Sequence, residues 1–216
     1  MIDMHRRIRG LLCALFALAL AAQPCIAWSD EAVARGAPKQ LRSTLPGELS
    51  ARHLTVLGLR VGNDGLAAVQ GRVGEAVAFS PESAPELVTT CFVDADDRSL
   101  AVMFQAHRYD PTGRLTMAFI GAPSAMQTSV RRCQPRAALA EAAATASGIY
   151  LGMSREEFAQ QFPYPPSERG NRLLGYYFYQ PLPDGGCQLL SGVRAQFDGY
   201  GLSALTVYRL YRGAGC

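Results

Sequence analysis

The histidines are the first residues to consider for catalysis or metal binding. Beyond residue 27 there are two of them, His53 and His107. Histidine serves most often as a general acid or base and as a metal ligand. Neither residue stands in a nucleophile elbow or another local catalytic motif, and His107 falls inside a strand-like run. We therefore predict no catalytic residue, although a triad assembled from distant positions stays open, because geometry defines such sites.

A second group that could bind a cation is the acidic stretch Asp94, Asp96 and Asp97. Calcium loops alternate oxygen ligands and carry glycine at position six and glutamate at position twelve. Counted from Asp94, these positions hold Ser99 and Gln105. The pattern favours a solvated turn, and the sequence has no glycine-rich phosphate-binding loop. We expect neither a metal nor a cofactor.

Four cysteines lie beyond residue 27, and their spacings of 42, 54 and 29 residues exclude the close pairs of zinc and redox sites. An even number of cysteines in an exported chain predicts two disulfide bonds. Three pairings are possible, and the repeat described below favours one bond in each half. The predicted pairs are Cys91–Cys133 and Cys187–Cys216.

The expectation of export comes from residues 1–27. Three arginines between residues 6 and 9 precede an uncharged apolar run over 11–22, and small residues follow up to Ala27. This order is typical of a secretory signal peptide, and the run is shorter than the roughly 20 residues that span a membrane. We expect cleavage after Ala27, or five to six residues earlier, and a periplasmic or secreted product with no membrane span.

Charge argues against nucleic acid as a partner. The chain has 21 basic and 18 acidic residues, and three arginines and one aspartate of these fall within residues 1–27. The remaining 18 basic and 17 acidic residues give a net charge of +1. Nucleic-acid binding normally requires a basic face.

The elements of the chain are predicted to form two similar halves. The first half, residues 53–133, contains a helix with Val69 and Val73 on one side, followed by strand-like runs. An Ala-rich linking helix at 134–147 connects it to the second half, residues 148–216. A loosely ordered lead-in at 28–52 precedes the first half. The predicted strands are 87–93, 100–108 and 115–120 in the first half and 172–180, 188–198 and 202–212 in the second.

A helix start is marked clearly in the second half. Ser154 and Glu157 stand three residues apart, as in a capping box, and Phe158 and Phe162 then share one helical face. Pro163 ends this helix. Together the two halves predict an α+β fold made of two tandem helix-plus-antiparallel-sheet lobes.

Tyrosines and arginines on the second-half strands are the residues that point to a function. Eight of the nine tyrosines lie from residue 150 onward. Tyrosine and arginine are enriched at protein-binding hot spots, although strand propensity alone also favours tyrosine. By alternation, Tyr177 shares a face with Tyr179, Arg209 shares a face with Tyr211, and Arg194 points outward. The predicted partner-binding residues are Tyr177, Tyr179, Arg194, Arg209 and Tyr211.

The second half also resembles a known family. The segments Leu151-Gly152-Met153-Ser154, Tyr176-Tyr177-Phe178-Tyr179, Ala195-Gln196-Phe197-Asp198 and Gly201-Leu202 are similar to the BamE (SmpA/OmlA) family. That family shares its fold with the β-lactamase inhibitor protein, which has two tandem helix-plus-sheet units. The resemblance covers most of 148–216 and little of the first half. It implies a sheet whose curved face binds another protein. Because this chain lacks a lipobox, its outline is closer to the inhibitor proteins.

The sequence therefore predicts a non-enzymatic protein-binding scaffold of the bacterial envelope. It could act as an inhibitor, an immunity-type protein or an accessory of envelope assembly. Two alternatives stay open. A hydrolase would need His53 or His107 beside a nucleophile or carboxylate in a cleft, and a carrier of a small apolar ligand would need a sizeable cavity between helix and sheet.

Overall fold

The computed structural model describes residues 45, 49–96, 98–126, 130–139, 144–183 and 186–212. The predicted signal peptide at 1–27, most of the predicted lead-in at 28–52, and Cys216 lie outside the described residues. All described residues belong to one compact unit of the chain.

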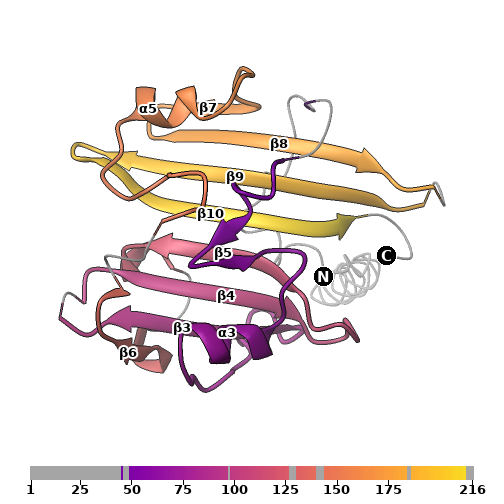
Figure 1. Ribbon diagram of the computed structural model, residues 1–216, viewed down its shortest axis with the longest axis vertical. Helices are drawn as coiled ribbons and strands as arrows, with labels where there is room; N and C mark the ends of the chain where they lie inside the picture. Colours follow the sequence, from indigo (N-terminus) through magenta and orange to yellow (C-terminus); the bar gives the residue numbers. More distant parts are fainter. Residues whose placement is uncertain are drawn as a thin grey trace, which may run out of the picture. The chain divides into compact units, whose positions relative to one another are not determined.

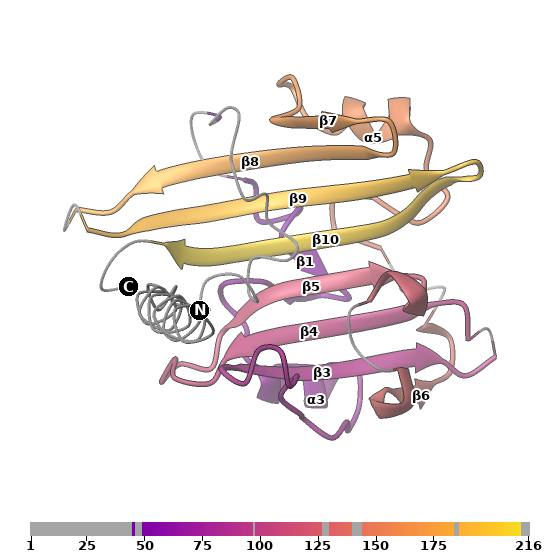
Figure 2. The ribbon, with the colours of Figure 1, turned by 180° about the vertical axis from the view of Figure 1, so that it is seen from behind.

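Its main feature is a single eight-stranded sheet with the order β6-β3-β4-β5-β10-β9-β8-β7 (Figures 1 and 2). Neighbouring strands are antiparallel except β6, which is parallel to β3. The strands are β3 (Leu87–Asp94), β4 (Ala101–His107), β5 (Leu115–Gly121), β6 (Gln134–Arg136), β7 (Glu168–Gly170), β8 (Leu173–Pro181), β9 (Gln188–Asp198) and β10 (Gly201–Arg212).

The smaller elements are helical or form a short hairpin. Strands β1 (Thr55–Val56) and β2 (Leu59–Arg60) pair with each other. The α-helices of the described residues are α3 (Leu66–Arg72) and α5 (Arg155–Gln160), and two 3-10 turns, η1 (Pro123–Ala125) and η2 (Val130–Arg132), follow β5.

The predicted fold class, two tandem α+β lobes, is wrong. Strand is the predominant regular structure of the described residues, and the two α-helices have only seven and six residues. The last strands of the two predicted lobes, β5 and β10, pair along Met117–Gly121 and Ala204–Tyr208 and make one continuous sheet. In two separate lobes β5 and β10 would each be an edge strand with unpaired backbone N–H and C=O groups. Pairing the two strands satisfies these groups and joins the lobes into one sheet. Both strands also bury side chains on both of their faces, as central strands do.

Individual elements follow the sequence more closely. The predicted strand at 188–198 coincides with β9, and the other five long strands differ by one or two residues at their ends. The predicted capping box is confirmed: Ser154 Oγ accepts from Glu157 N at 3.2 Å, and Glu157 Oε2 accepts from Ser154 N at 2.9 Å. Residues 134–147, predicted as a linking helix, begin with strand β6, and 140–143 lie outside the described residues.

One face of the sheet, here the helix-side face, is covered by α3, α5 and the β1–β2 hairpin (Figure 1). Its core joins both halves of the sheet, with Phe104 and Ile120 on one side and Tyr176 and Val193 on the other. Phe162, just after α5, stacks on Tyr176 with ring centroids 3.9 Å apart. Helix α5 is thus held by aromatic packing as well as by its capping box, whereas α3 has no side-chain cap and packs through Val69.

The opposite face, seen in Figure 2, holds a second core cluster and the disulfide bond. The predicted bond Cys91–Cys133 is confirmed, and it ties β3 to the residue that precedes β6. Cys187 is also disulfide-bonded, and its predicted partner Cys216 lies outside the described residues. On β8, β9 and β10 we call this side the tyrosine face, defined by Gly175, Tyr177, Tyr179, Leu190, Gly192, Arg194, Thr206 and Tyr208.

Candidate binding surface on the tyrosine face

Two tyrosine rings of this face pack closely against glycines of the sheet. Tyr177, Gly192 and Tyr208 are opposite one another on β8, β9 and β10. A Cβ on Gly192 would lie 2.5 Å from the Tyr208 hydroxyl and 2.7 Å from Cδ1 of Tyr177, and one on Gly175 would collide with the Tyr177 hydroxyl. Because the glycines leave no room for a side chain, the ring positions are fixed by the sheet.

The Tyr177 hydroxyl donates a hydrogen bond to Oε2 of Glu168 on β7. The same oxygen lies 3.4 Å from Nε of Arg194 on β9, which forms an ion pair. Tyr177 is fully buried, whereas the side chains of Glu168 and Arg194 are 26% and 25% exposed. The cluster therefore begins inside the sheet and ends at its surface.

Electrostatics keep both phenols of this cluster neutral. Burial, and then the hydrogen bond to Glu168, raise the pKa of Tyr177 well above its usual value. Burial, together with the nearby Tyr177 and Glu168, also raises the pKa of Tyr208. The Tyr208 hydroxyl adjoins that of Tyr177, yet no described residue gives it a hydrogen bond of good geometry. Neutral phenols in this setting can donate hydrogen bonds but cannot act as nucleophiles.

The structure brings together only part of the predicted partner-binding set. Tyr177, Tyr179 and Arg194 lie on the tyrosine face, and of these Tyr177 is buried and the other two are half-buried. Arg209 and Tyr211 lie on the helix-side face. Arg209 packs across the backbone of Gly62, and Tyr211 is exposed at the end of β10.

Sequence reasoning missed the residues that hold Arg194 in place. Glu168 belongs to the three-residue strand β7, which is too short to show a period-two pattern. Tyr208, Gly175 and Gly192 were in predicted strands, but their contacts depend on the cross-strand register. The sequence signal that could have indicated these contacts is the pair of glycines inside the strands, because glycine in a strand often marks the close approach of another group.

His53 lies beside a hydroxyl, as a hydrolase would require. Ser50 Oγ is 2.7 Å from His53 Nδ1, and the ring stacks on Phe162 at 4.7 Å. The two residues belong to one tight turn, in which the Ser50 carbonyl accepts from the backbone N–H groups of His53 and Leu54. This turn accounts for the contact locally, and among the described residues no carboxylate contacts the imidazole of His53 or of His107.

The acidic stretch does not form a cation site in the described part of the chain. Asp94 is buried at the end of β3, and its Oδ1 accepts from Asp96 N at 3.0 Å. The expected solvated turn therefore fits Asp96 but not Asp94, and Asp97 lies outside the described residues. No group of three or more histidine, cysteine, aspartate or glutamate residues among those described could hold a metal ion.

No family model, curated protein or solved structure matches this chain. The resemblance to the BamE family stays a prediction. Among the helices of the described residues, none has both the length and the apolar composition needed to cross a bilayer.

Proposed function

We propose that this chain is an exported, non-enzymatic scaffold that binds another protein through the tyrosine face of β7–β10. The observation that carries the proposal is the position of Arg194. Its Nε lies against Glu168, which the buried Tyr177 holds, and its side chain is partly exposed at the surface. Among the described residues Glu168 is the ion-pair partner of this guanidinium, and the 25% of the arginine side chain that is exposed is the part that we propose a partner contacts.

Rigidity favours binding at this surface. Side chains that are already fixed before association lose little entropy when a partner docks. Here the tyrosine rings are fixed by Gly175 and Gly192, and the arginine is fixed by Glu168. An anchored arginine surrounded by aromatic residues is the composition found at the centres of protein interfaces. In this proposal Tyr177 is a positioning residue, while Arg194 and Tyr179 contact the partner.

Export is supported by two independent features. The disulfide bond Cys91–Cys133 is typical of an oxidising compartment, and the sequence of residues 1–27 is typical of a signal peptide. The partner is accordingly a protein of the periplasm or cell exterior.

Site-specific photo-crosslinking in the native host tests the surface. Gln196 is exposed two residues from Arg194 on the same strand, and Gln70 is an exposed glutamine on α3, on the other side of the sheet. Benzoylphenylalanine at position 196 is expected to capture one defined partner, identified by mass spectrometry, whereas the same residue at position 70 is not.

A second variant tests whether Arg194 is the contact. Arg194→Ala in the Gln196 crosslinking background should remove the adduct, and Arg98→Ala, an exposed arginine in the β3–β4 turn, should keep it. An adduct that survives Arg194→Ala, or equal capture from position 70, contradicts binding at the tyrosine face. Unchanged thermal unfolding of both variants shows that the fold is retained.

A further inference from the structure

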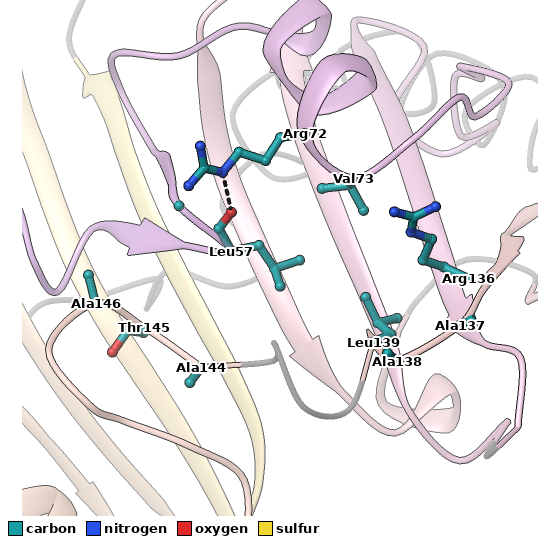
Figure 3. Close-up of a pocket in the computed structure, with 11 residues that line it drawn as sticks. Leu57, Arg72, Val73, Arg136, Ala137, Ala138, Leu139, Ala144, Thr145 and Ala146 are labelled. Carbon is teal, nitrogen blue, oxygen red and sulfur yellow. Dashed lines mark hydrogen bonds between the residues drawn. The ribbon is translucent and has the colours of Figure 1, made fainter.

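A pocket of about 540 Å³ lies beside the C-terminal end of α3 (Figure 3). Its walls come from the end of α3, the β1–β2 turn, the last residue of β6 with the chain just after it, and residues 144–146. The volume falls within the range of about 300–1,000 Å³ that is common for small-molecule sites. None of its lining residues belongs to the tyrosine face, so the pocket is a site separate from the proposed protein-binding surface.

The charged groups of the pocket are both cationic. Arg72 and Arg136 line it, and none of the described lining residues is acidic. Arg72 Nε donates to the Leu57 carbonyl at 3.2 Å, which orients this guanidinium. Within the described residues no carboxylate forms an ion pair with either arginine. Two guanidinium groups that no described carboxylate neutralises make the pocket attractive to anions.

Apolar side chains separate the two charges. Figure 3 shows the Arg72 guanidinium on one side of Val73 and the Arg136 guanidinium on the other. Val73 and Leu139 are almost fully buried, and Leu57 packs against the same core. The guanidinium groups therefore do not converge on one point, and a ligand that reaches both must pass an apolar surface.

The backbone of this pocket is held in unusual conformations. Leu57 and Ala138 are the two non-glycine residues of the described chain with positive φ, at 53° and 56°, and both line the pocket. Leu57 and Gly58 (φ 74°) form a two-residue hairpin turn in which both φ values are positive, where asparagine normally precedes glycine. For a bulky residue this conformation is strained, and strained residues concentrate at ligand sites.

From these observations we propose that the pocket binds a small organic dianion whose two anionic groups flank a short apolar segment. One anionic group binds Arg72, the other binds Arg136, and the apolar segment lies along the apolar lining of the pocket, to which the half-buried Leu57 contributes. A linear dicarboxylate has this chemistry. Carboxylate and phosphate groups both suit guanidinium, so the essential feature is the pair of anionic ends and not the identity of the acid.

Isothermal titration calorimetry on the full chain tests the proposal with a series of dicarboxylates from succinate to sebacate. Octanoate is the control with one anionic end and a chain as long as that of suberate, and inorganic phosphate is the control with no apolar segment. We expect one site per chain, tightest binding for one length of dicarboxylate, and at least about tenfold weaker binding of octanoate, since one charge-assisted contact is lost.

Three variants complete the test. Arg72→Gln and Arg136→Gln should each weaken dicarboxylate binding at least about tenfold, while Arg98→Gln changes the net charge equally and should leave it unchanged. Equal binding of octanoate and suberate, an effect of only one of the two arginines, or competition by phosphate at similar concentration would overturn the dianion site. Absence of measurable binding for every member of the series would do so as well.

Discussion

At the scale of single residues, His53 shows how a potentially reactive group is used by the fold. Its ring stacks on Phe162, its Nδ1 lies beside the Ser50 hydroxyl, and the Gln161 backbone is a further neighbour. Burial, and to a lesser extent the nearby Arg52, lower the pKa of His53 below 6.5. The neutral ring therefore joins the turn at 50–54 to the end of α5.

This lowered pKa predicts a pH dependence of stability. Since the unfolded chain binds a proton to His53 more readily than the folded chain, the free energy of unfolding falls as the pH drops below about 6.5 and is fully restored above it. His53→Phe keeps an aromatic ring on Phe162 but removes the titration. Urea unfolding between pH 5 and 7.5 should show a flatter profile for this variant than for the wild type.

His107→Phe is the control, because it removes a histidine from the end of β4, away from the turn that holds His53. If the wild-type and His53→Phe profiles run parallel over this pH range, the coupling of His53 protonation to folding is refuted. Retained function in His53→Phe would further argue against a hydrolase that uses Ser50 and His53.

At the scale of elements, the central contact is that of tyrosine rings on glycines across β8, β9 and β10. Tyr177 is among the predicted contact residues, yet it is buried over Gly175 and Gly192 and bound to Glu168. Tyr208 adds a second ring from the other side of Gly192. Tyr177 binds Glu168, and Glu168 pairs with Arg194, the proposed contact residue. The packing of these strands therefore determines the position of Arg194.

The glycine at the middle of this contact is predicted to be indispensable. In Gly192→Ala the new methyl group would meet both tyrosine rings, which cannot leave without losing their buried positions. We expect the free energy of unfolding to fall by about 1–3 kcal/mol, as in overpacked cores. The matched control is Gly71→Ala in α3, where nothing lies within 4 Å and about 0.5–1 kcal/mol of stabilisation is expected.

Denaturant unfolding of the two variants measures both effects. Opposite signs are expected for the same chemical change, because one glycine is enclosed by rings and the other faces open space. A Gly192→Ala variant as stable as the wild type would show that the rings move freely, and would remove the basis for a rigid Arg194.

The predictable elements were those with local signals. The capping box at Ser154 and the six long strands depend on neighbouring residues or on period two, and the structure has both. Strands β1, β2, β6 and β7 have two or three residues each and carry no periodic signal. Two of the segments that line the pocket, the β1–β2 turn and the chain at the end of β6, belong to these short elements. No sequence pattern therefore marked Arg72 and Arg136 as neighbours.

At the scale of the whole molecule, the two similar halves are joined into one sheet. Each half has a short helix followed by three long antiparallel strands, as the sequence indicated, but β5 and β10 pair and the cores of the two halves merge. The sequence contained a sign of this in β5 and β10, where apolar residues occupy both alternating positions. Strands with one solvated face alternate more regularly, whereas interior strands read as nearly continuous apolar runs.

The outer strands of the sheet are protected in a similar way at both ends. Beside β3 lie β6 and, at Thr89, the backbone of Phe79. Beside β8 lie β7 and, at Phe178, the backbone of Leu45. Short covering segments of this kind limit the pairing of an edge with other chains. They leave the broad face of β7–β10, and not its edge, as the surface on which we place the partner.

A single sheet predicts that both halves lose structure together. Leu205 on β10 is 1% exposed and faces Ile120 on β5 and Ala195 on β9, so it contacts both halves. Leu205→Ala should lower the free energy of unfolding by about 2–5 kcal/mol through the cavity it leaves. Hydrogen exchange followed by mass spectrometry should show the protection of β3–β4 and of β8–β9 falling by the same amount, because both exchange through one global opening.

Val77→Ala serves as the control, because Val77 is 70% exposed and its truncation should change stability by less than about 0.5 kcal/mol. Two lobes that fold independently predict a different result: protection would fall in β8–β10 and stay unchanged in β3 and β4. That outcome would mean that the β5–β10 pairing contributes little stability. The common fall is expected because the apolar core on the helix-side face runs without interruption from Phe92 to Phe178, and neither half can expose its part without exposing the other's.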